Sequence, residues 1–307
     1  MNLELFIARR IAHNGSGNRP GVMVRIAVVA VALSVTVMIL ALAVIMGFKR
    51  EITDRVTGFS AQVEVADLRS AGSIESVPVL RSEQLERTIR SAGEVVRLTP
   101  YAVKGGVVKT PDAILGVMLK GVDGGYEWSF FRDHLLEGEL PRVGDSIRTK
   151  EILISRSVAR EMGLAPGDKV EMLFVESEKS PRRDRFKVSG IYATGMDEFD
   201  RSVAMTDLRN VQRLADWSSE EVSGYEVTLA DFLQAEDFSR RLNDMLLDSD
   251  REAFWDLTAR SAQERFPTVF DWLKTHDVNA AVILVIMVVV AVFNMATALL
   301  TLVLERT

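Results

Sequence analysis

The stretch Ile26–Phe48 reads IAVVAVALSVTVMILALAVIMGF and contains no charged residue. A second stretch with the same property, Asn279–Leu304, reads NAAVILVIMVVVAVFNMATALLTLVL. At about 1.5 Å per residue, either stretch as a helix can cross a hydrocarbon core of about 30 Å. The sequence therefore predicts two membrane-spanning helices, one near each end of the 307-residue chain.

Two other interpretations of these stretches are a signal peptide for the first and a buried core helix for the second. A signal peptide has a shorter apolar region, of about 7–15 residues, followed by a small-residue cleavage site, whereas Met46-Gly47-Phe48-Lys49-Arg50 stands here. An uninterrupted apolar stretch also lacks the polar face that a surface helix of a water-soluble protein needs. Membrane spans fit both stretches better.

The basic residues beside the first span predict its orientation. Arg9, Arg10, Arg19 and Arg25 precede it against a single acid, Glu4, so we expect the N-terminus in the cytoplasm. Two spans return the C-terminus to the same side. The middle of the chain then lies on the far side of the membrane.

Charge is distributed unevenly along the chain. The formal net charge is −6; residues 1–48 carry four arginines and one glutamate, and residues 277–307 carry a net charge of −1, which leaves −8 for residues 49–276. An acidic middle domain argues against nucleic acid as a partner. Cysteine is absent, which excludes disulfides and thiolate metal sites. His13, His134 and His276 are far apart in sequence, so we expect solvated or capping roles for them rather than metal binding.

Between the spans the sequence predicts mixed α and β structure. Runs rich in β-branched residues predict strands at 61–65, 95–98, 113–118, 152–154, 169–174, 186–191 and 225–228. Helical patterns fall at 82–91, 155–162, 206–215 and 231–247, the last with Asp231 as N-cap and Leu233, Phe238, Leu242 and Leu246 as its apolar stripe. Strands and helices do not alternate regularly, so the predicted fold class is α+β rather than a doubly wound parallel sheet.

A further helical pattern begins near Ser261 and runs on into the second span. Phe266, Phe270 and Leu273 lie near one face of it. Pro267 is near its start, where proline is tolerated because its missing N–H would have no partner in any case. The pattern predicts a continuous stalk leading into the membrane.

The sequence contains no catalytic constellation that we recognise. Gly-x-x-x-x-Gly-Lys-Ser is missing, so the chain carries no nucleotide-binding P-loop. Gly-x-Ser-x-Gly and His-Glu-x-x-His are missing as well. We therefore expect a non-catalytic protein with no cofactor and no metal site of its own.

Several stretches together carry a family resemblance. They are Leu5–Ile11, Ile45–Glu51, Gly138–Pro141, Glu151–Ser155, Met162–Val170, Ala291–Thr297 and Leu302–Thr307. In order, they resemble the opening amphipathic segment, the exit from the first span, the strand, helix and Gly-Asp turn of the outer domain, and the second span with its exit, in permease subunits of the MacB/FtsX/LolC superfamily of ABC transporters. The lipoprotein-releasing LolC/LolE branch is the most similar. Each motif alone is weak, and Pro166-Gly167-Asp168 is also ordinary turn chemistry.

This resemblance implies an organisation in six parts. Residues 1–21 form a cytoplasmic amphipathic segment and elbow, 22–48 the first transmembrane helix, 49–260 a periplasmic α+β domain of the MacB-like core type, 261–278 a stalk helix, 279–304 the second transmembrane helix, and 305–307 the start of a cytoplasmic loop. The family continues with a coupling helix and two further spans, so the chain resembles the first portion of a permease. The implied location is the bacterial inner membrane, as a multi-pass protein.

The resemblance also implies partners and sites. A permease of this kind pairs with a second protomer, identical or different, and is driven by a cytoplasmic ABC ATPase dimer that binds the ATP and magnesium. In the lipoprotein-releasing branch, acyl chains enter a cavity between spans of two protomers, and the candidates for lining it are Ile45, Met46, Phe48, Phe266, Val269 and Phe270. A hairpin at 175–185, with Pro181, Arg182 and Arg183, stands where a periplasmic lipoprotein carrier would dock.

Alternatives remain open for residues and function alike. The cavity candidates also suit interhelical packing or lipid contact, and the hairpin also suits a solvated turn. Within the same fold, an efflux permease or a division-linked permease is possible, although the latter usually has a much smaller outer domain. From another class, a transmembrane sensor with an extracytoplasmic ligand domain has the same two-span topology.

Overall fold

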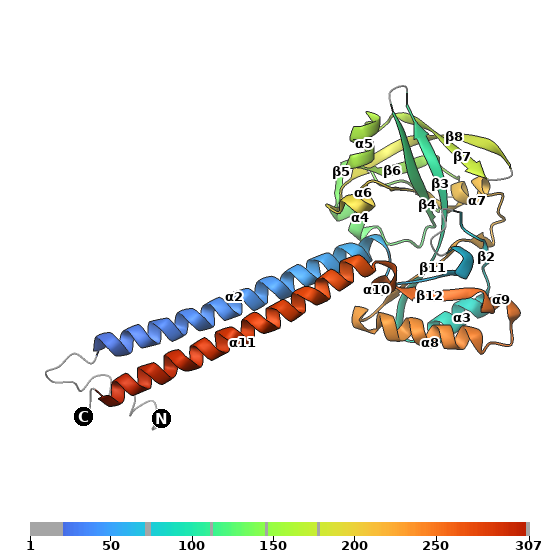
Figure 1. Cartoon of the computed structure of the whole chain (residues 1–307). Coiled ribbons are helices and arrows are strands. Elements are labelled where there is room, and N and C mark those ends of the chain that lie inside the picture. The colour runs from blue at the N-terminus through green and yellow to red at the C-terminus, as the bar shows by residue number, and fades with distance from the viewer. Residues whose placement is uncertain (1–20, 71–74, 111–112, 145–146, 177–178, 305–307) are drawn as a thin grey trace. The chain divides into compact units, whose positions relative to one another are not determined.

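The computed structural model describes residues 21–70, 75–110, 113–144, 147–176 and 179–304 (Figure 1). By its internal contacts the chain divides into two compact units. Met1–Ile52 together with Thr268–Thr307 forms the helix unit, and Thr53–Pro267 forms the folded unit. Of the amphipathic segment and elbow expected in residues 1–21, all but Gly21 lies outside the described residues, as does the exit at 305–307.

The helix unit is built from two long helices, α2 (Gly21–Phe59) and α11 (Pro267–Leu304). Both contain segments long and apolar enough to cross a membrane, Val29–Phe59 and Pro267–Thr297. Helices of 39 and 38 residues are roughly 57 Å long, which exceeds a hydrocarbon core of about 30 Å. Only 6% of the apolar window in α11 is buried within the chain, so a core helix does not explain it.

Ten strands form one mixed sheet in the described part of the folded unit. They are β1 (Val63–Asp67), β3 (Val95–Lys109), β4 (Ile114–Val122), β5 (Leu135–Gly138), β6 (Glu151–Ser155), β7 (Lys169–Glu176), β8 (Lys179–Tyr192), β9 (Val203–Asp207), β11 (Gly224–Leu229) and β12 (Leu257–Ser261). Their order is β12-β1-β11-β3-β4-β9-β6-β8-β5, and β7 pairs with β3 and β8. Only the β4–β9 and β6–β8 pairs are parallel. A separate pair is formed by β2 (Val79–Leu80) and β10 (Glu221–Val222).

Strand β3 connects two lobes of the folded unit, one built on β12, β1 and β11 and the other on β4, β9, β6, β8 and β5 (Figure 1). Its first half, from Val95 to Tyr101, pairs with β11, and its second half, from Tyr101 to Lys109, pairs with β4. A 15-residue strand of this kind makes one continuous hydrogen-bonded path between the lobes.

Short helices cover the sheet. They are α3 (Glu83–Ser91), α4 (Ser129–Asp133), α5 (Arg156–Met162), α6 (Asp197–Asp200), α7 (Leu208–Leu214), α8 (Ala235–Leu247), α9 (Glu252–Trp255) and α10 (Ala262–Arg265), with 3₁₀ turns at Leu68–Ser70 and Phe232–Gln234. Helix α8 packs on β12 and on α3, and α7 packs on β3 and β4. The α8 stripe is buried, with Phe238, Leu242 and Leu246 each 0% exposed. Buried apolar residues between Val63 and Ala259 form one core cluster that holds the folded unit together.

The predicted α+β class is confirmed, and most predicted elements are present, but three local predictions were wrong. The helix predicted at 206–215 begins at Leu208, because Thr206 and Asp207 end strand β9 and Asp207 caps the helix instead. Leu233 is 80% exposed and lies in a 3₁₀ turn, so it does not belong to the α8 stripe. Asp231 does cap that turn, since its carboxylate accepts a hydrogen bond from Leu233 N.

The third wrong prediction is the start of the stalk at Ser261, whereas the predicted continuity of stalk and second span is present in α11. Ser261 ends β12 and caps the short helix α10, and Phe266 then leaves the helical region at φ −123°, ψ 57° before α11 starts at Pro267. The pyrrolidine ring of a proline disfavours helical backbone in the residue before it, so the chain breaks at Phe266.

Candidate functional site at the helix roots

The six residues predicted to line a lipid cavity fall into both units. Ile45, Met46 and Phe48 lie on α2, and Val269 and Phe270 lie on α11, all in the helix unit. Met46 is 69% exposed, whereas Phe270 is only 6% exposed. Phe266 belongs to the folded unit.

Phe48 has a neighbour that sequence reasoning did not single out. The rings of Phe48 and Trp272 are 5.6 Å apart in an edge-on arrangement, and Trp272 in turn contacts His276 at 4.4 Å. Phe48 and Trp272 are 45% and 46% exposed. Tryptophan is enriched at membrane interfaces, and that preference could have flagged Trp272 from the sequence.

Within the folded unit, the last turns of α2 pack on an aromatic cluster, the helix-root cluster, made of Phe59, Phe131, Tyr192, Phe199 and Phe266. Phe59, the last residue of α2, stacks on Phe199 at 4.6 Å and lies 6.0 Å from Phe131. Phe131 meets Tyr192 edge-on at 5.1 Å. Aromatic pairs of this geometry contribute about 0.5–1.5 kcal/mol each beyond their buried area.

The start of α11 is fixed to the same cluster. Phe266 packs edge-on against Phe199 at 5.1 Å, so Phe199 of α6 touches the residues at which both long helices join the folded unit. Ser261 and Glu264 form a capping box that holds α10 in place just before Phe266. We call the end of α2 and the residues just before α11 the helix roots. The ring of Phe199 therefore links the α2 root to the α11 root.

Polar contacts fix the loop that carries α6. The Asp200 carboxylate accepts hydrogen bonds from Thr194 N and Oγ1 at 3.1 and 2.8 Å and from Gly195 N at 3.2 Å. Arg55, in the last turns of α2, donates to the carbonyl oxygen of Thr194 at 2.6 Å. Gly195 adopts φ 76°, and a Cβ there would lie 2.6 Å from Arg55 Nη1. The α6 loop is thus held to α2 by both ring packing and a direct hydrogen bond.

A buried charge cluster joins α10 to the centre of the sheet. Glu64 of β1 lies directly opposite Glu226 of β11, an arrangement of like charges that is unfavourable unless it is compensated. Arg265 of α10 and Arg260 of β12 reach Glu64 Oε2 at 2.9 and 3.3 Å. Lys120 of β4 reaches Glu226 Oε1 at 2.5 Å. The cations thereby compensate both carboxylates.

Burial raises the pKa of Glu64, but Arg265, the hydrogen bond from the Tyr101 hydroxyl, Arg260 and Lys120 outweigh burial and hold that pKa below its ordinary value of 4.5. Burial together with Glu64 raises the pKa of Tyr101 well above 10.0, so its hydroxyl keeps its proton and donates to Glu64. Glu64 is thus an ionised group at neutral pH that ties the α11 root, through Arg265, to strand β1.

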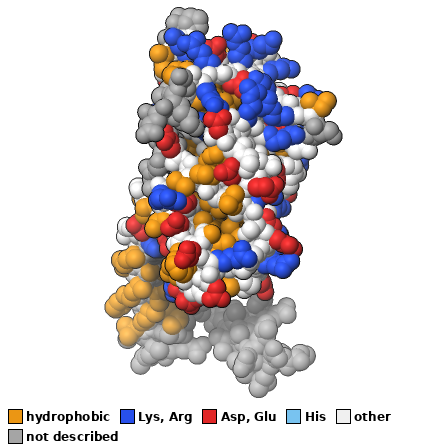
Figure 2. Space-filling view, turned by 90° about the vertical axis from the view of Figure 1, so that its right-hand side faces the viewer, with side chains coloured by type: hydrophobic (Ala, Val, Ile, Leu, Met, Phe, Trp, Pro, Cys, Tyr) orange, Lys and Arg blue, Asp and Glu red, His pale blue; other side chains and the backbone are white. Residues whose placement is uncertain are grey.

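The predicted docking hairpin is present as β7 and β8. Pro181 is exposed at the start of β8. Arg182 bonds back to the domain, to Asp216 Oδ2 at 2.5 Å and to the carbonyl oxygen of Arg213. Arg183 is 74% exposed and, together with Arg185 at 76%, faces only Glu171. Figure 2 shows Lys and Arg side chains gathered toward the upper end of the face on which β7 and β8 lie in Figure 1.

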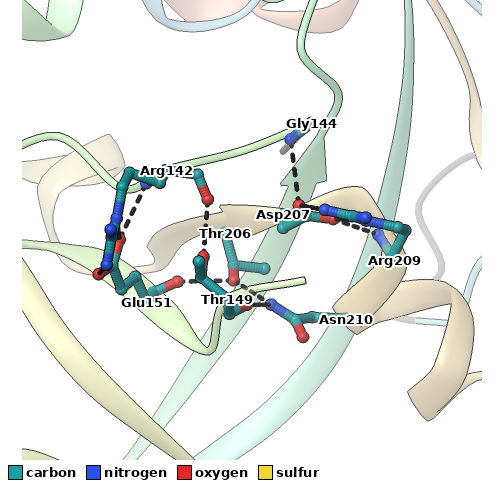
Figure 3. A network of polar contacts seen from close by, with 8 residues as sticks. All are labelled: Arg142, Gly144, Thr149, Glu151, Thr206, Asp207, Arg209 and Asn210. Atoms are coloured by element: carbon teal, nitrogen blue, oxygen red, sulfur yellow. Dashed lines mark hydrogen bonds and ion pairs between the residues drawn. The ribbon is translucent and has the colours of Figure 1, made fainter. Parts of the chain in front are cut away.

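A polar network fixes the loop that follows the Gly138–Pro141 motif (Figure 3). Arg142 pairs with Glu151 at 2.8 Å, and Gly144 N donates to Asp207 Oδ2 at 3.2 Å. Asn210 donates to Thr149 O at 2.8 Å and to Thr206 Oγ1 at 2.9 Å. These bonds hold the loop onto β6, β9 and α7, so this part of the motif set has a structural role.

His134 and His276 have the ordinary roles that their spacing predicts, whereas His13 lies outside the described residues. His134 Nδ1 bonds to the carbonyl oxygen of Phe130 at 2.8 Å, and His276 packs on Trp272. Among the described residues, no group of three or more His, Cys, Asp or Glu side chains could hold a metal ion.

Residues 26–245 match the family model of the MacB-like periplasmic core domain. The chain belongs to this family. Among MacB-like relatives, the lipoprotein-releasing system transmembrane protein LolC of Xylella fastidiosa is 26% identical over 280 residues, which cover 86% of this chain and 61% of that protein. LolC of Neisseria meningitidis serogroup B is 25% identical over 276 residues, 86% of this chain and 62% of that protein. The chain thus spans about three fifths of the length of the curated relatives it matches.

Two solved structures that are similar to this chain are also distant from it in sequence. The periplasmic region of MacB from Actinobacillus actinomycetemcomitans is 14% identical, with a TM-score of 0.44 over 68% of this chain and 92% of that chain. The extracellular domain of the noncanonic ABC-type transporter YknZ from Gram-positive bacteria is 15% identical, with a TM-score of 0.41 over 65% of this chain and all of that chain.

The helix-root cluster and the buried charge cluster were not predicted from the sequence. Phe266 was considered as a lipid contact, and the structure places it, half-buried, against Phe199. No spacing rule relates Glu64 to Arg265, which are far apart in sequence and meet only through the sheet.

Proposed function

We propose that this chain is a permease subunit of an ABC transporter, in which a cytoplasmic ATPase drives a conformational change of the periplasmic domain to release lipoproteins from the inner membrane. Family membership over residues 26–245, with LolC similarity over 86% of the chain, is the observation that carries this proposal. The ATPase dimer binds the ATP and magnesium, and a second permease protomer completes the transporter. The protein sits in the bacterial inner membrane with its large domain in the periplasm.

The helix roots supply the physical coupling that this function needs. A displacement of either long helix moves Phe59 or Phe266, and both press on Phe199. The Arg265–Glu64 pair carries motion of the α11 root into strand β1. Coupling of this kind runs through contiguous contacts between packed elements rather than through a pore.

Extraction of acyl chains is the step that requires energy, because each buried CH₂ contributes about 0.8 kcal/mol to membrane anchoring. In the proposed transporter, Ile45, Met46, Phe48, Val269 and Phe270 contact these chains, with Phe266 at the edge of the folded unit. The exposure of Met46, 69%, and of Phe48, 45%, supports lipid contact on α2.

The test is affinity purification of the native full-length product in mild detergent, followed by identification of what copurifies. We expect an ABC ATPase and acylated lipoproteins. An ATPase with an envelope adaptor and no lipoprotein would favour an efflux permease. A histidine kinase module without an ATPase would replace the transporter with a sensor.

Matched variants locate the lipid contact in the same experiment. Met46→Gln places an amide where we expect acyl chains, so the amount of copurified lipoprotein should fall while the ATPase is retained. Met38→Gln makes the same change farther from the folded unit on the same helix and serves as the control. Equal losses in both variants would remove Met46 from the proposed cavity.

Carrier docking at the β7–β8 hairpin is a separate part of the proposal. Exposed Arg183 and Arg185 give the hairpin a basic face, which suits an acidic partner surface. Replacing both by alanine should reduce retention of a periplasmic carrier. Arg87→Ala, which removes an exposed arginine from α3, is the control and should leave retention unchanged.

A further inference from the structure

A cavity of about 250 Å³ lies between the last turns of α2 and the sheet of the folded unit. It is lined by Asp54, Thr57, Gly58, Ala61, Gln62, Arg97, Thr99, Tyr126, Glu127, Ser129, Phe130, Glu226 and Thr228. Alternation along the strands explains its polar floor, because Arg97 and Thr99 share one face of β3 and the paired Glu226 and Thr228 share the same face of β11. The apolar side chains of these strands point to the opposite face, into the core.

Several hydroxyl groups line the cavity, and one of them, that of Thr57, donates to the carbonyl oxygen of Thr53. The hydroxyls of Thr99, Tyr126, Ser129 and Thr228 have no hydrogen-bond partner within the described residues. Thr99 is only 5% exposed, so the cavity is its route to a partner. Ser129 is exposed and Tyr126 and Thr228 are half-buried, so these hydroxyls are open to whatever occupies the cavity.

The charged groups of the cavity are largely neutralised by the protein. Glu226 accepts from Lys120 through Oε1, while Oε2 has no hydrogen-bond partner among the described residues. At the rim, Arg97 pairs with Glu127 at 3.0 Å. The cavity therefore offers one spare carboxylate oxygen and several hydroxyls, which favours a neutral ligand rich in hydroxyl groups over an ion.

The volume and the aromatic lining of the cavity further restrict the kind of ligand that can bind. Typical small-molecule pockets are about 300–1,000 Å³, so this cavity suits a molecule smaller than most cofactors. Tyr126 and Phe130 contribute aromatic side chains to its wall. We propose that the cavity beneath the end of α2 binds one neutral sugar ring, whose hydroxyls pair with Thr99, Tyr126 and Glu226.

The test is saturation-transfer NMR with D-glucose on the full chain in a zwitterionic detergent, because alkyl maltosides and glucosides carry the proposed ligand as their head group. Thr99→Val and Tyr126→Phe each remove one hydroxyl with little change of shape. Thr258→Val removes a strand hydroxyl on β12, outside the cavity, and is the control. One hydrogen bond corresponds to a change in affinity of about fivefold.

We expect saturation transfer to D-glucose in the wild-type chain and an affinity about fivefold weaker in Thr99→Val and in Tyr126→Phe, with Thr258→Val unchanged. Two variants are included so that misfolding of one leaves the other as a test. Absence of transfer to D-glucose in the wild-type chain would show that the cavity holds only water. Unchanged affinity in both Thr99→Val and Tyr126→Phe, or equal weakening in all three variants, would place any binding elsewhere. Either result overturns the proposal, and neither bears on the permease function.

Discussion

The two long helices join the folded unit in different ways. Helix α2 is continuous from Gly21 to Phe59, so its last turns belong to the folded unit without any interruption of the backbone. Helix α11 starts at Pro267, after the non-helical Phe266 has separated it from the short helix α10. The α2 root is a continuous helix, and the α11 root contains a break in the helical backbone at Phe266.

The difference shows that each root depends on a different kind of contact. The α2 root is held by ring packing of Phe59 and by the Arg55–Thr194 hydrogen bond. The α11 root is held by side chains at the backbone break and just before it. Phe266 packs against Phe199, and Arg265 pairs with Glu64. A continuous helix transmits displacement through its own hydrogen bonds, whereas a broken one needs such side-chain anchors.

The largest expected effect comes from removing the anchor of the α11 root. Glu64→Gln leaves Arg265, whose side chain is 17% exposed, without its carboxylate, and breaking a buried pair costs about 3 kcal/mol of unfolding free energy. Urea unfolding of the full chain in detergent, followed by tryptophan fluorescence, measures this loss at pH 7. Glu83→Gln removes an exposed partner of Arg87 and should cost at most about 0.5 kcal/mol.

The same variant has a defined pH dependence. The pKa of Glu64 is lower in the folded chain than its ordinary value of 4.5, so its stabilising contribution is complete above pH 4.5 and is lost as the pH falls through the folded-state pKa. The gap in unfolding free energy between wild type and Glu64→Gln should therefore narrow below pH 4.5. A gap that stays constant into acid would show that the carboxylate charge is not what anchors α10.

An effect of similar size on unfolding free energy, but more local in hydrogen exchange, is expected at the ring of Phe199. Phe199 is 5% exposed, and Phe199→Ala should cost about 3 kcal/mol. Hydrogen exchange should rise in both 53–59 and 262–267, because both roots pack on this ring. Phe174→Ala, at a residue 1% exposed in the sheet, should cost a similar amount without that paired rise. Faster exchange at one root only would show that Phe199 does not link them.

The smallest effect concerns the break itself. Pro267→Ala removes the steric restriction on Phe266, so α10 and α11 can approach a continuous helix, with a change in unfolding free energy within about 1 kcal/mol. Slower hydrogen exchange over 262–272 is the expected result. Pro166→Ala, in the Gly-Asp turn, should leave that segment unchanged. Unaltered exchange in Pro267→Ala would mean that packing of Phe266, rather than the proline, maintains the break.

Much of the fold could be predicted because it depends on local patterns. Periodicity gave α3, α5 and α8 and the central strands, and Asp231 was correctly placed as a cap. Strands β5, β9 and β12 were not predicted, because Leu135–Gly138, Val203–Asp207 and Leu257–Ser261 are too mixed in composition to show a strand pattern. Their strand state comes from pairing with β8, with β4 and β6, and with β1, respectively.

The candidate site could be predicted only in part. The residues proposed for lipid contact and the hairpin at 175–185 followed from the family resemblance. The hydrogen-bond partners of the hairpin arginines could not be predicted in this way. Arg182 pairs with Asp216, whereas Arg183 stays exposed. Which side chain a strand residue meets depends on register, which one sequence does not reveal.

The sequence by itself determined the two apolar helices, the acidic α+β domain between them and the family to which that domain belongs. Those properties follow from composition, periodicity and motifs, each of which is local in the chain. Only the tertiary structure decided that Phe199 joins Phe59 to Phe266 and that Glu64 opposite Glu226 is compensated by Arg265, Arg260 and Lys120. These contacts join residues far apart in sequence, and buried charges and rings take partners that the packing of the whole sheet brings within reach.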